Sequence, residues 1–214
     1  MKLYLSSNGI PSPSQLEQLI GKPLSSVRFA LIENAKDYYS DRLRTFKIQQ
    51  GVQKFESFGM EVVPVDLRNY HNNEGLKSFL GGFDIIWGYG GNTFCLRYEM
   101  SRSGFDDVIR ELLSSGVVYG GESAGAIVAG KTLRGTEGAD IPEAAEEIIW
   151  DGTSLINKVI MPHADNLFFK DTVEHMRELY ASNPDYIEIN ETQALVINGD
   201  DIKLVDGDST DHKG

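Results

Sequence analysis

The stretch VVYGGESAGAIVAG, residues 117–130, determines how the rest of the chain can be arranged. Its first five residues are β-branched, aromatic or glycine and predict a buried strand, whereas the small apolar residues at its end are compatible with a helix. Between them, residues 121–125 (GESAG) fit the pattern G-x-S-x-G, in which a serine occupies the sharp turn from a strand into a helix. The stretch therefore predicts an α/β protein with Ser123 at the end of a central strand.

This turn has two interpretations. Ser123 can be an activated nucleophile, because a helix that starts after it would direct backbone N–H groups at the reacting centre. The alternative is a tight turn whose serine only caps a helix. A chain with 22 glycines can match the bare pattern by chance, but the strand before Ser123 and the helix-compatible segment after it favour the nucleophile.

The rest of the chain alternates short β-rich segments with longer helical ones. Apolar periodicity predicts helices over about 40–58, over 105–113 and around 173–180. Pro64 indicates a sheet edge or a strand end. Strands separated by helices imply a mostly parallel central sheet flanked by helices, and we expect one α/β domain over 1–214 with a frayed tail at 206–214. The expected strands are 2–6, 27–32, 61–67, 83–89, 117–121, 158–162, 186–189, 194–197 and 201–205.

Composition excludes several classes of protein. A net charge of -12, with cationic residues scattered along the chain, argues against a nucleic-acid partner. The sequence has no run of 18 apolar residues and no apolar signal core after its first lysine, so we expect no membrane partner. The single cysteine, Cys95, rules out an internal disulfide and favours a cytoplasmic location. We expect no metal or cofactor, and a homodimer stays open.

A second glycine-rich turn, GYGGNTF at 88–94, follows the fourth expected strand. Ligands of parallel sheets bind at the carboxyl ends of strands, so this turn and Ser123 should face one crevice. The N–H groups of Gly90, Gly91 and Ala124 are the expected oxyanion hole, and Asn92 is an expected substrate contact. A phosphate-binding loop is the alternative, but the turn lacks a lysine and the G-x-G-x-x-G spacing.

A nucleophilic serine needs a base, and the chain has four histidines. His212 lies in the polar tail, His71 in a polar loop, and His175 off the apolar stripe of its expected helix. His163 comes just after a strand, where Pro162 restricts the backbone, so it should lie at the same sheet edge as the two turns. By position His163 is the best candidate base, with a purely structural histidine as the alternative.

The acid that would orient the imidazole is not settled by the residues. Asp165 lies two positions after His163, and Glu191 follows the strand at 186–189. Asp140 belongs to an acidic stretch in which a solvated loop is the simpler interpretation. All three stay open as candidates on these grounds.

Five segments, in this order along the chain, resemble the peptidase E family of serine aspartyl dipeptidases, which is related to cyanophycinases and to class I glutamine amidotransferases. The resemblance implies a class I glutamine amidotransferase-like, or flavodoxin-like, fold and a triad of Ser123, His163 and Glu191. It also implies hydrolysis of dipeptides that begin with aspartate, through an acyl-enzyme and without a metal. The segments are GGNTF at 90–94, ESAGA at 122–126, DIP at 140–142, MPH at 161–163 and INETQALVI at 189–197.

One position departs from the family. Members carry an arginine after the histidine that would grip the substrate's aspartyl carboxylate, and this chain has Thr172 there. Lys170 or Arg177 could substitute for it, and Glu122 could receive the substrate's amino group. We expect a serine peptidase acting on small peptides, with a non-catalytic protein that binds a small amide or peptide in the same crevice as the alternative. Glutamine amidotransferase chemistry is disfavoured, because those enzymes use a cysteine nucleophile and Cys95 does not lie in a sharp strand-to-helix turn like that of Ser123.

Overall fold

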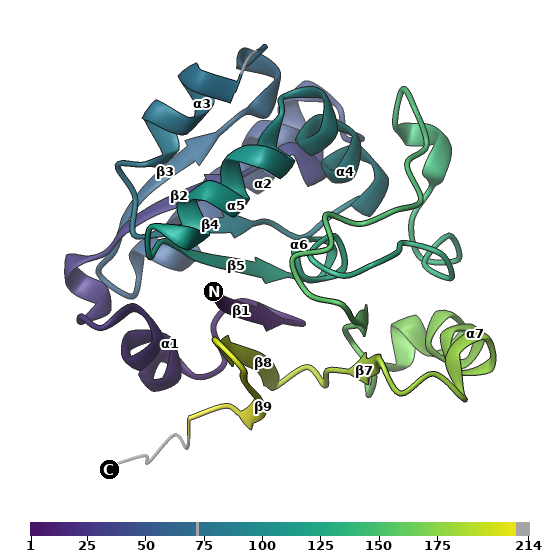
Figure 1. Ribbon diagram of the computed structural model, residues 1–214. Helices are drawn as coiled ribbons and strands as arrows, with labels where there is room; N and C mark the ends of the chain where they lie inside the picture. Colours follow the sequence, from purple (N-terminus) through teal and green to yellow (C-terminus); the bar gives the residue numbers. More distant parts are fainter. Residues whose placement is uncertain (72, 209–214) are drawn as a thin grey trace.

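The computed structural model describes residues 1–71 and 73–208. Its core is a seven-stranded sheet with the strand order β3-β2-β4-β5-β1-β8-β9 (Figure 1). A separate pair of parallel strands, β6 (Val159–Met161) and β7 (Tyr186–Glu188), lies beside it. The strands of the main sheet are β1 Lys2–Ser6, β2 Arg28–Ile32, β3 Glu61–Val65, β4 Ile85–Gly88, β5 Val118–Glu122, β8 Gln193–Asn198 and β9 Asp201–Asp206.

The central strands are buried on both faces because successive side chains alternate between two apolar layers. In β4, Ile85 and Trp87 contribute to the layer on one face and Ile86 to the layer on the other. In β1, Tyr4 lies on the Trp87 side, whereas Leu3 and Leu5 lie on the Ile86 side. This explains why these strands appear in the sequence as nearly continuous apolar runs.

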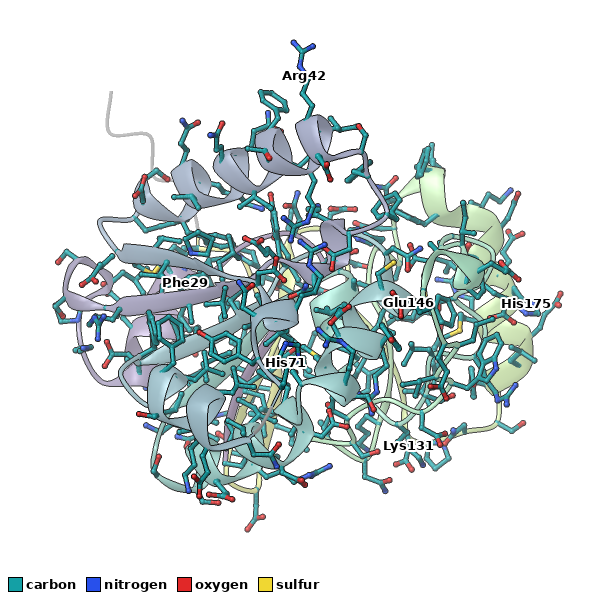
Figure 2. All side chains as sticks on the ribbon, turned by 90° about the horizontal axis from the view of Figure 1, so that it is seen from above. Phe29, Arg42, His71, Lys131, Glu146 and His175 are labelled. Carbon is teal, nitrogen blue, oxygen red and sulfur yellow. The ribbon has the colours of Figure 1, made fainter. Side chains whose placement is uncertain are left out.

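Helices cover both faces, as an α/β sheet requires. Helices α1 (Pro13–Ile20) and α2 (Asp41–Glu56) pack on the Trp87 face, and α3 (Asn73–Leu80), α4 (Thr93–Arg102) and α5 (Phe105–Ser114) pack on the Ile86 face. Figure 2 shows the resulting contrast between the interior position of Phe29 and the solvent-directed side chains of Arg42 and His175. The remaining helices are α6 Ala124–Ile127 and α7 Lys170–Tyr180, with single turns η1 Leu24–Ser26, η2 Asn34–Lys36, η3 Leu67–Asn69, η4 Pro142–Ala144 and η5 Leu167–Phe169.

The expectation of a mostly parallel sheet flanked by helices is confirmed. Strands β3, β2, β4, β5 and β1 are parallel, and β3, which contains Pro64, forms an edge. The C-terminal strands differ, because β8 pairs antiparallel with β1 and then with β9. The carboxyl ends of β1, β4, β5, β6 and β7 lie at one edge of the molecule. Ser123 N donates to the Ser6 carbonyl (3.0 Å), and Gly90 packs on Ser123. The Ser7 hydroxyl joins His163 N to the Ile189 carbonyl.

Two features differ from the sequence-based expectations. Helix α4 shows no apolar stripe because its residues are buried on most sides, and the charge of Arg97 is satisfied inside by Asp106 (2.6 Å). Residues 206–208 lie in the tail that we expected to be frayed, but Asp206 is the last residue of β9 and Asp208 accepts a hydrogen bond from Ser14 N of α1 (2.9 Å). The rest of the expected frayed tail and His212 lie outside the described residues. Within the part of the chain that the structure describes, no helix is long and apolar enough to cross a membrane.

Candidate active site

Ser123 stands between β5 and α6 with a backbone conformation of φ 52° and ψ -114°. Residues with a side chain rarely adopt this region, and its cost is accepted where the surrounding structure enforces it. The neighbouring glycines leave space for the turn: a Cβ on Gly121 would come within 2.4 Å of the Gly125 carbonyl, and one on Gly125 within 2.0 Å of the Gly88 carbonyl oxygen. The chain thus packs its backbone against itself to hold Ser123 at the tip.

The second glycine turn lies against the serine. A Cβ on Gly90 would be 3.2 Å from the Ser123 Cβ, and Gly91 has φ 144° with its α-carbon facing the Ala35 carbonyl. Among the described residues, no hydrogen bond engages the backbone N–H of Gly90, Gly91 or Ala124. These donors are therefore free to serve an oxyanion beside Ser123.

Asn92, an expected substrate contact, has a different environment. Its side chain caps α4 by accepting from Cys95 N (2.9 Å) and donates to the Ile141 carbonyl (2.9 Å). The side chain is buried and both of its polar ends are used. Asn92 thereby fixes the glycine turn to the segment that carries Asp140.

His163 follows β6, and its Nδ1 lies 2.5 Å from Glu191 Oε1. A carboxylate can only accept, so this contact places the proton on Nδ1 and leaves Nε2 as the atom that can take a proton. His163 also has a positive φ, 62°, which turns the ring out of the strand direction. No hydrogen bond among the described residues joins Ser123 to His163, although both line the same cavity.

The sequence analysis did not identify the residues that hold His163 and Glu191 in place. The buried Ser7 hydroxyl accepts from His163 N (2.8 Å) and donates to the Ile189 carbonyl (2.8 Å). Asn166 Nδ2 donates to Glu191 Oε1 (2.7 Å), and the Phe169 ring stacks on the imidazole with centroids 4.4 Å apart. Ser7 comes just after the end of β1, and this position is the only signal by which the sequence marks it. Asn166 caps the turn η5, where its side chain also accepts from Phe168 N (2.9 Å).

The three candidate acids have distinct positions. Glu191 contacts the imidazole, whereas Asp165 accepts from the Glu191 backbone N–H (2.8 Å) and so orients that residue. Asp140 Oδ2 accepts from Thr93 N (3.0 Å) and Thr93 Oγ1 (2.5 Å). Burial raises the pKa of Asp140, opposed by the Thr93 hydrogen bonds and by the nearby His163.

Three expected substrate contacts lie elsewhere. The buried Glu122 carboxylate accepts from Gly9 N and pairs with Lys54 Nζ (2.8 Å). Arg177 grips Glu188 through two hydrogen bonds (2.7 and 2.8 Å). Lys170, on the exposed start of α7, lies 3.7 Å from Glu174. The structure brings none of these three into the cavity at Ser123.

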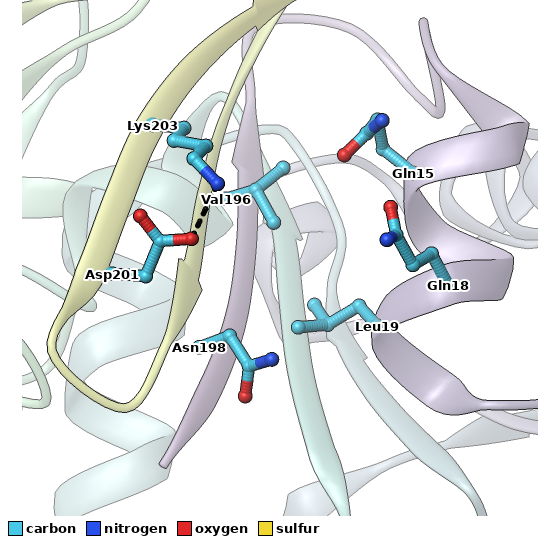
Figure 3. Close-up of a pocket in the computed structure, with 7 residues that line it drawn as sticks. All are labelled: Gln15, Gln18, Leu19, Val196, Asn198, Asp201 and Lys203. Atoms are coloured by element: carbon cyan, nitrogen blue, oxygen red, sulfur yellow. Dashed lines mark hydrogen bonds and ion pairs between the residues drawn. The ribbon is translucent and has the colours of Figure 1, made fainter.

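The cavity has a volume of about 390 Å³ and contains Ser123, His163, Gly91, Asp140 and Thr172 in its lining. This volume is within the range of small-molecule sites. A second hollow of about 90 Å³ lies between α1 and the β8–β9 hairpin, where Lys203 pairs with Asp201 (Figure 3). None of the candidate site residues lines that hollow, whereas Ser123 and His163 both line the larger cavity.

Other reactive side chains are poorly placed for chemistry. Cys95 is buried in α4, and burial raises the pKa of its thiol to about 12. His71 and His175 are exposed. A strained serine and a carboxylate-bound histidine at one edge of an α/β sheet are the arrangement of hydrolytic enzymes, a class that recurs on several unrelated folds.

Comparison with known proteins specifies the class further. The sequence model of peptidase family S51 matches residues 14–205, and the chain belongs to this family. An uncharacterized peptidase of Listeria innocua is 28% identical over 165 residues, which cover 76% of this chain and 78% of the relative. Another, from Listeria monocytogenes, is 30% identical over 159 residues (74% and 77%). Peptidase E of Haemophilus influenzae is 29% identical over 151 residues (65% and 62%).

Solved structures agree on the fold. A candidate peptidase E protein from Listeria monocytogenes superposes with a TM-score of 0.80 at 24% identity, covering 96% of this chain and 98% of its own. A peptidase from an acI-B1 actinobacterium gives a TM-score of 0.70 at 23% identity, covering 97% of this chain and 88% of its own. The chain is therefore a peptidase of family S51 with the fold of these neighbours.

Proposed function

We propose that the protein is a serine peptidase that hydrolyses short peptides through an acyl-enzyme on Ser123. The observation that carries this proposal is the backbone of Ser123, strained at φ 52° and ψ -114° beside free N–H groups. A serine that only capped a helix would gain nothing from such strain and would use its side chain in a hydrogen bond. Among the described residues, none engages the Ser123 hydroxyl.

In this mechanism Ser123 Oγ attacks the peptide carbonyl while His163 Nε2 takes its proton. The carbonyl oxygen becomes an oxyanion that accepts hydrogen bonds from Gly91 N and Ala124 N. His163 then gives the proton to the leaving amine, and water repeats the sequence on the acyl-enzyme. Glu191 holds the imidazole and stabilises its cationic form through the 2.5 Å contact with Nδ1.

The mechanism requires Ser123 and His163 to come within hydrogen-bond distance. Catalytic hydrogen bonds are often long before substrate binds and tighten in the complex. His163 is fixed by its backbone bond to Ser7 and by Glu191, so we propose that rotation of the Ser123 side chain supplies most of the approach.

A short peptide brings a free amino group, which needs a carboxylate. Glu122 already pairs with Lys54, and the cavity contains Asp140 instead. Both Thr93 hydrogen bonds go to Oδ2 of Asp140, and no bond among the described residues uses its Oδ1. We propose that Asp140 Oδ1 accepts from the substrate ammonium, so N-acetylation of a peptide should lower kcat/KM by about 10- to 100-fold.

A fluorophosphonate probe followed by intact-mass measurement tests the nucleophile. We expect one covalent adduct on the wild type and none on Ser123→Ala, with peptide hydrolysis lost in parallel. Ser154→Ala is the matched control, because Ser154 also has a positive φ (51°) but is exposed and outside the cavity. Labelling that persists in Ser123→Ala would refute the assignment. Absence of both labelling and hydrolysis in the wild type would favour a binding protein.

A further inference from the structure

The cavity at Ser123 has a mainly apolar wall. The side chains that form it come from the β2–α2 connection, α6, the β6 end and η5: Tyr38, Ile127, Met161, Pro162, Phe168 and Phe169. Phe169 is fixed against His163, whereas Phe168 stands at the rim with 86% of its surface exposed. An exposed phenylalanine beside a nucleophile has apolar surface available for a substrate to cover.

The charges of the same cavity are unfavourable for an acidic side chain. None of its described lining residues is lysine or arginine, and Asp140 contributes a carboxylate. The lysine and the arginine of α7 do not line the cavity and are paired elsewhere, Arg177 with Glu188 and Lys170 with Glu174. Thr172, which lies between Lys170 and Arg177 on α7 and is 7% exposed, contributes an uncharged side chain to the cavity wall. A substrate carboxylate would lose water here and meet a like charge in return.

We infer that the substrates are short peptides whose first residue is apolar, with aromatic side chains preferred, and that acidic first residues are rejected. This inference rests on the proposed function. A single first residue carries both the ammonium group and the side chain on one α-carbon, so both must enter the same cavity. Asp140 suits the ammonium group, and the apolar wall suits the side chain.

Steady-state kinetics on a panel of dipeptides tests the preference. The panel pairs Phe-Ala and Leu-Ala with Asp-Ala and with its neutral isostere Asn-Ala. Burial of an apolar side chain should make kcat/KM for Phe-Ala about 10- to 100-fold larger than for Asn-Ala. Asp-Ala should be poorer than Asn-Ala, because the two differ only in charge. A larger kcat/KM for Asp-Ala than for Phe-Ala would overturn the inference and leave the peptidase assignment intact.

Two neighbouring residues offer a matched pair of variants. Phe168→Ala removes part of the cavity wall and should raise KM for Phe-Ala several-fold while changing kinetics on Gly-Ala much less. Leu167→Ala is the control, because Leu167 is 87% exposed and does not line the cavity. Both side chains are exposed, so neither substitution should impair folding. Equal effects of the two variants would contradict a role for the wall in selectivity.

A binding measurement separates selectivity from turnover. Ser123→Ala should retain the cavity, so saturating Phe-Ala should raise its Tm whereas Asp-Ala at equal concentration should not. Stabilisation by Asp-Ala alone would overturn the inference. If no peptide is hydrolysed by the wild type but Phe-Ala stabilises Ser123→Ala, the proposed function fails while the selectivity of the cavity stands.

Discussion

Replacing Ser123 with glycine should abolish hydrolysis and also make the protein more stable. The observed φ of 52° and ψ of -114° cost a residue with a Cβ about 1–3 kcal/mol, and glycine avoids this cost. The glycine variant loses about 0.4–1 kcal/mol of stability, because glycine gives the unfolded chain more conformational freedom. The Ser123 hydroxyl makes no hydrogen bond among the described residues, so its removal adds little. The net gain in the free energy of unfolding should be about 1 kcal/mol.

Urea unfolding of the wild type, Ser123→Gly and Ser123→Ala measures this gain. Alanine keeps the Cβ and the strain, so its stability should stay within about 0.5 kcal/mol of the wild type. For a chain of 214 residues the glycine variant should melt about 2–4 °C higher per kcal/mol gained. Unchanged m-values would show that the unfolded states are comparable. A glycine variant no more stable than the alanine variant would refute stored strain at Ser123.

Three further predictions concern stability and the support of the site. Burial lowers the pKa of Lys36 to about 8, so the folded protein releases this proton before the unfolded chain does, and the wild type should gain stability from pH 8 to 10.5. Lys36→Met should be about 1–2 kcal/mol more stable than the wild type at pH 7, and this difference should disappear between pH 8 and 10.5. Gly125→Ala should lose about 1–3 kcal/mol in urea unfolding, because its Cβ meets the Gly88 carbonyl at 2.0 Å. Ser7→Ala leaves His163 N and the Ile189 carbonyl without their hydrogen-bond partner. The variant should therefore lose about 1–3 kcal/mol of stability in urea unfolding, and it should show a lower kcat with little change in KM.

The sequence could predict the fold class because the central strands are apolar on both faces and two of them, β4 and β5, are followed by glycine-rich turns. The turn at Ser123 and the glycine turn at 90–91 could be predicted to lie at the same edge of the sheet from the parallel topology alone. The antiparallel addition of β8 to β1 could not be foreseen, because the pairing partner of a short apolar strand depends on the whole sheet. Helix α4 escaped prediction because burial on most sides leaves no periodic pattern.

Within the site, residues alone could not decide among Asp140, Asp165 and Glu191. All three follow strands or precede helices. Only the structure shows that the Glu191 carboxylate contacts the imidazole, whereas the Asp165 carboxylate accepts from a backbone amide. The support from Ser7 was equally invisible, since its two contacts lie more than 150 residues away in sequence. Long-range side-chain contacts of this kind leave no local pattern.

The position of Glu191, just before the antiparallel strand β8, also sets the earliest time at which the site can be completed during synthesis. Synthesis proceeds from the N-terminus, so Ser123 and His163 leave the ribosome before Glu191, and β8, which follows Glu191, pairs with β1 from the start of the chain. Under the proposed mechanism, a nascent chain therefore holds a serine and a histidine without the carboxylate that orients them. The proposed hydrolysis therefore requires a segment that is synthesised late and that directly precedes the strand pairing with the first strand of the chain.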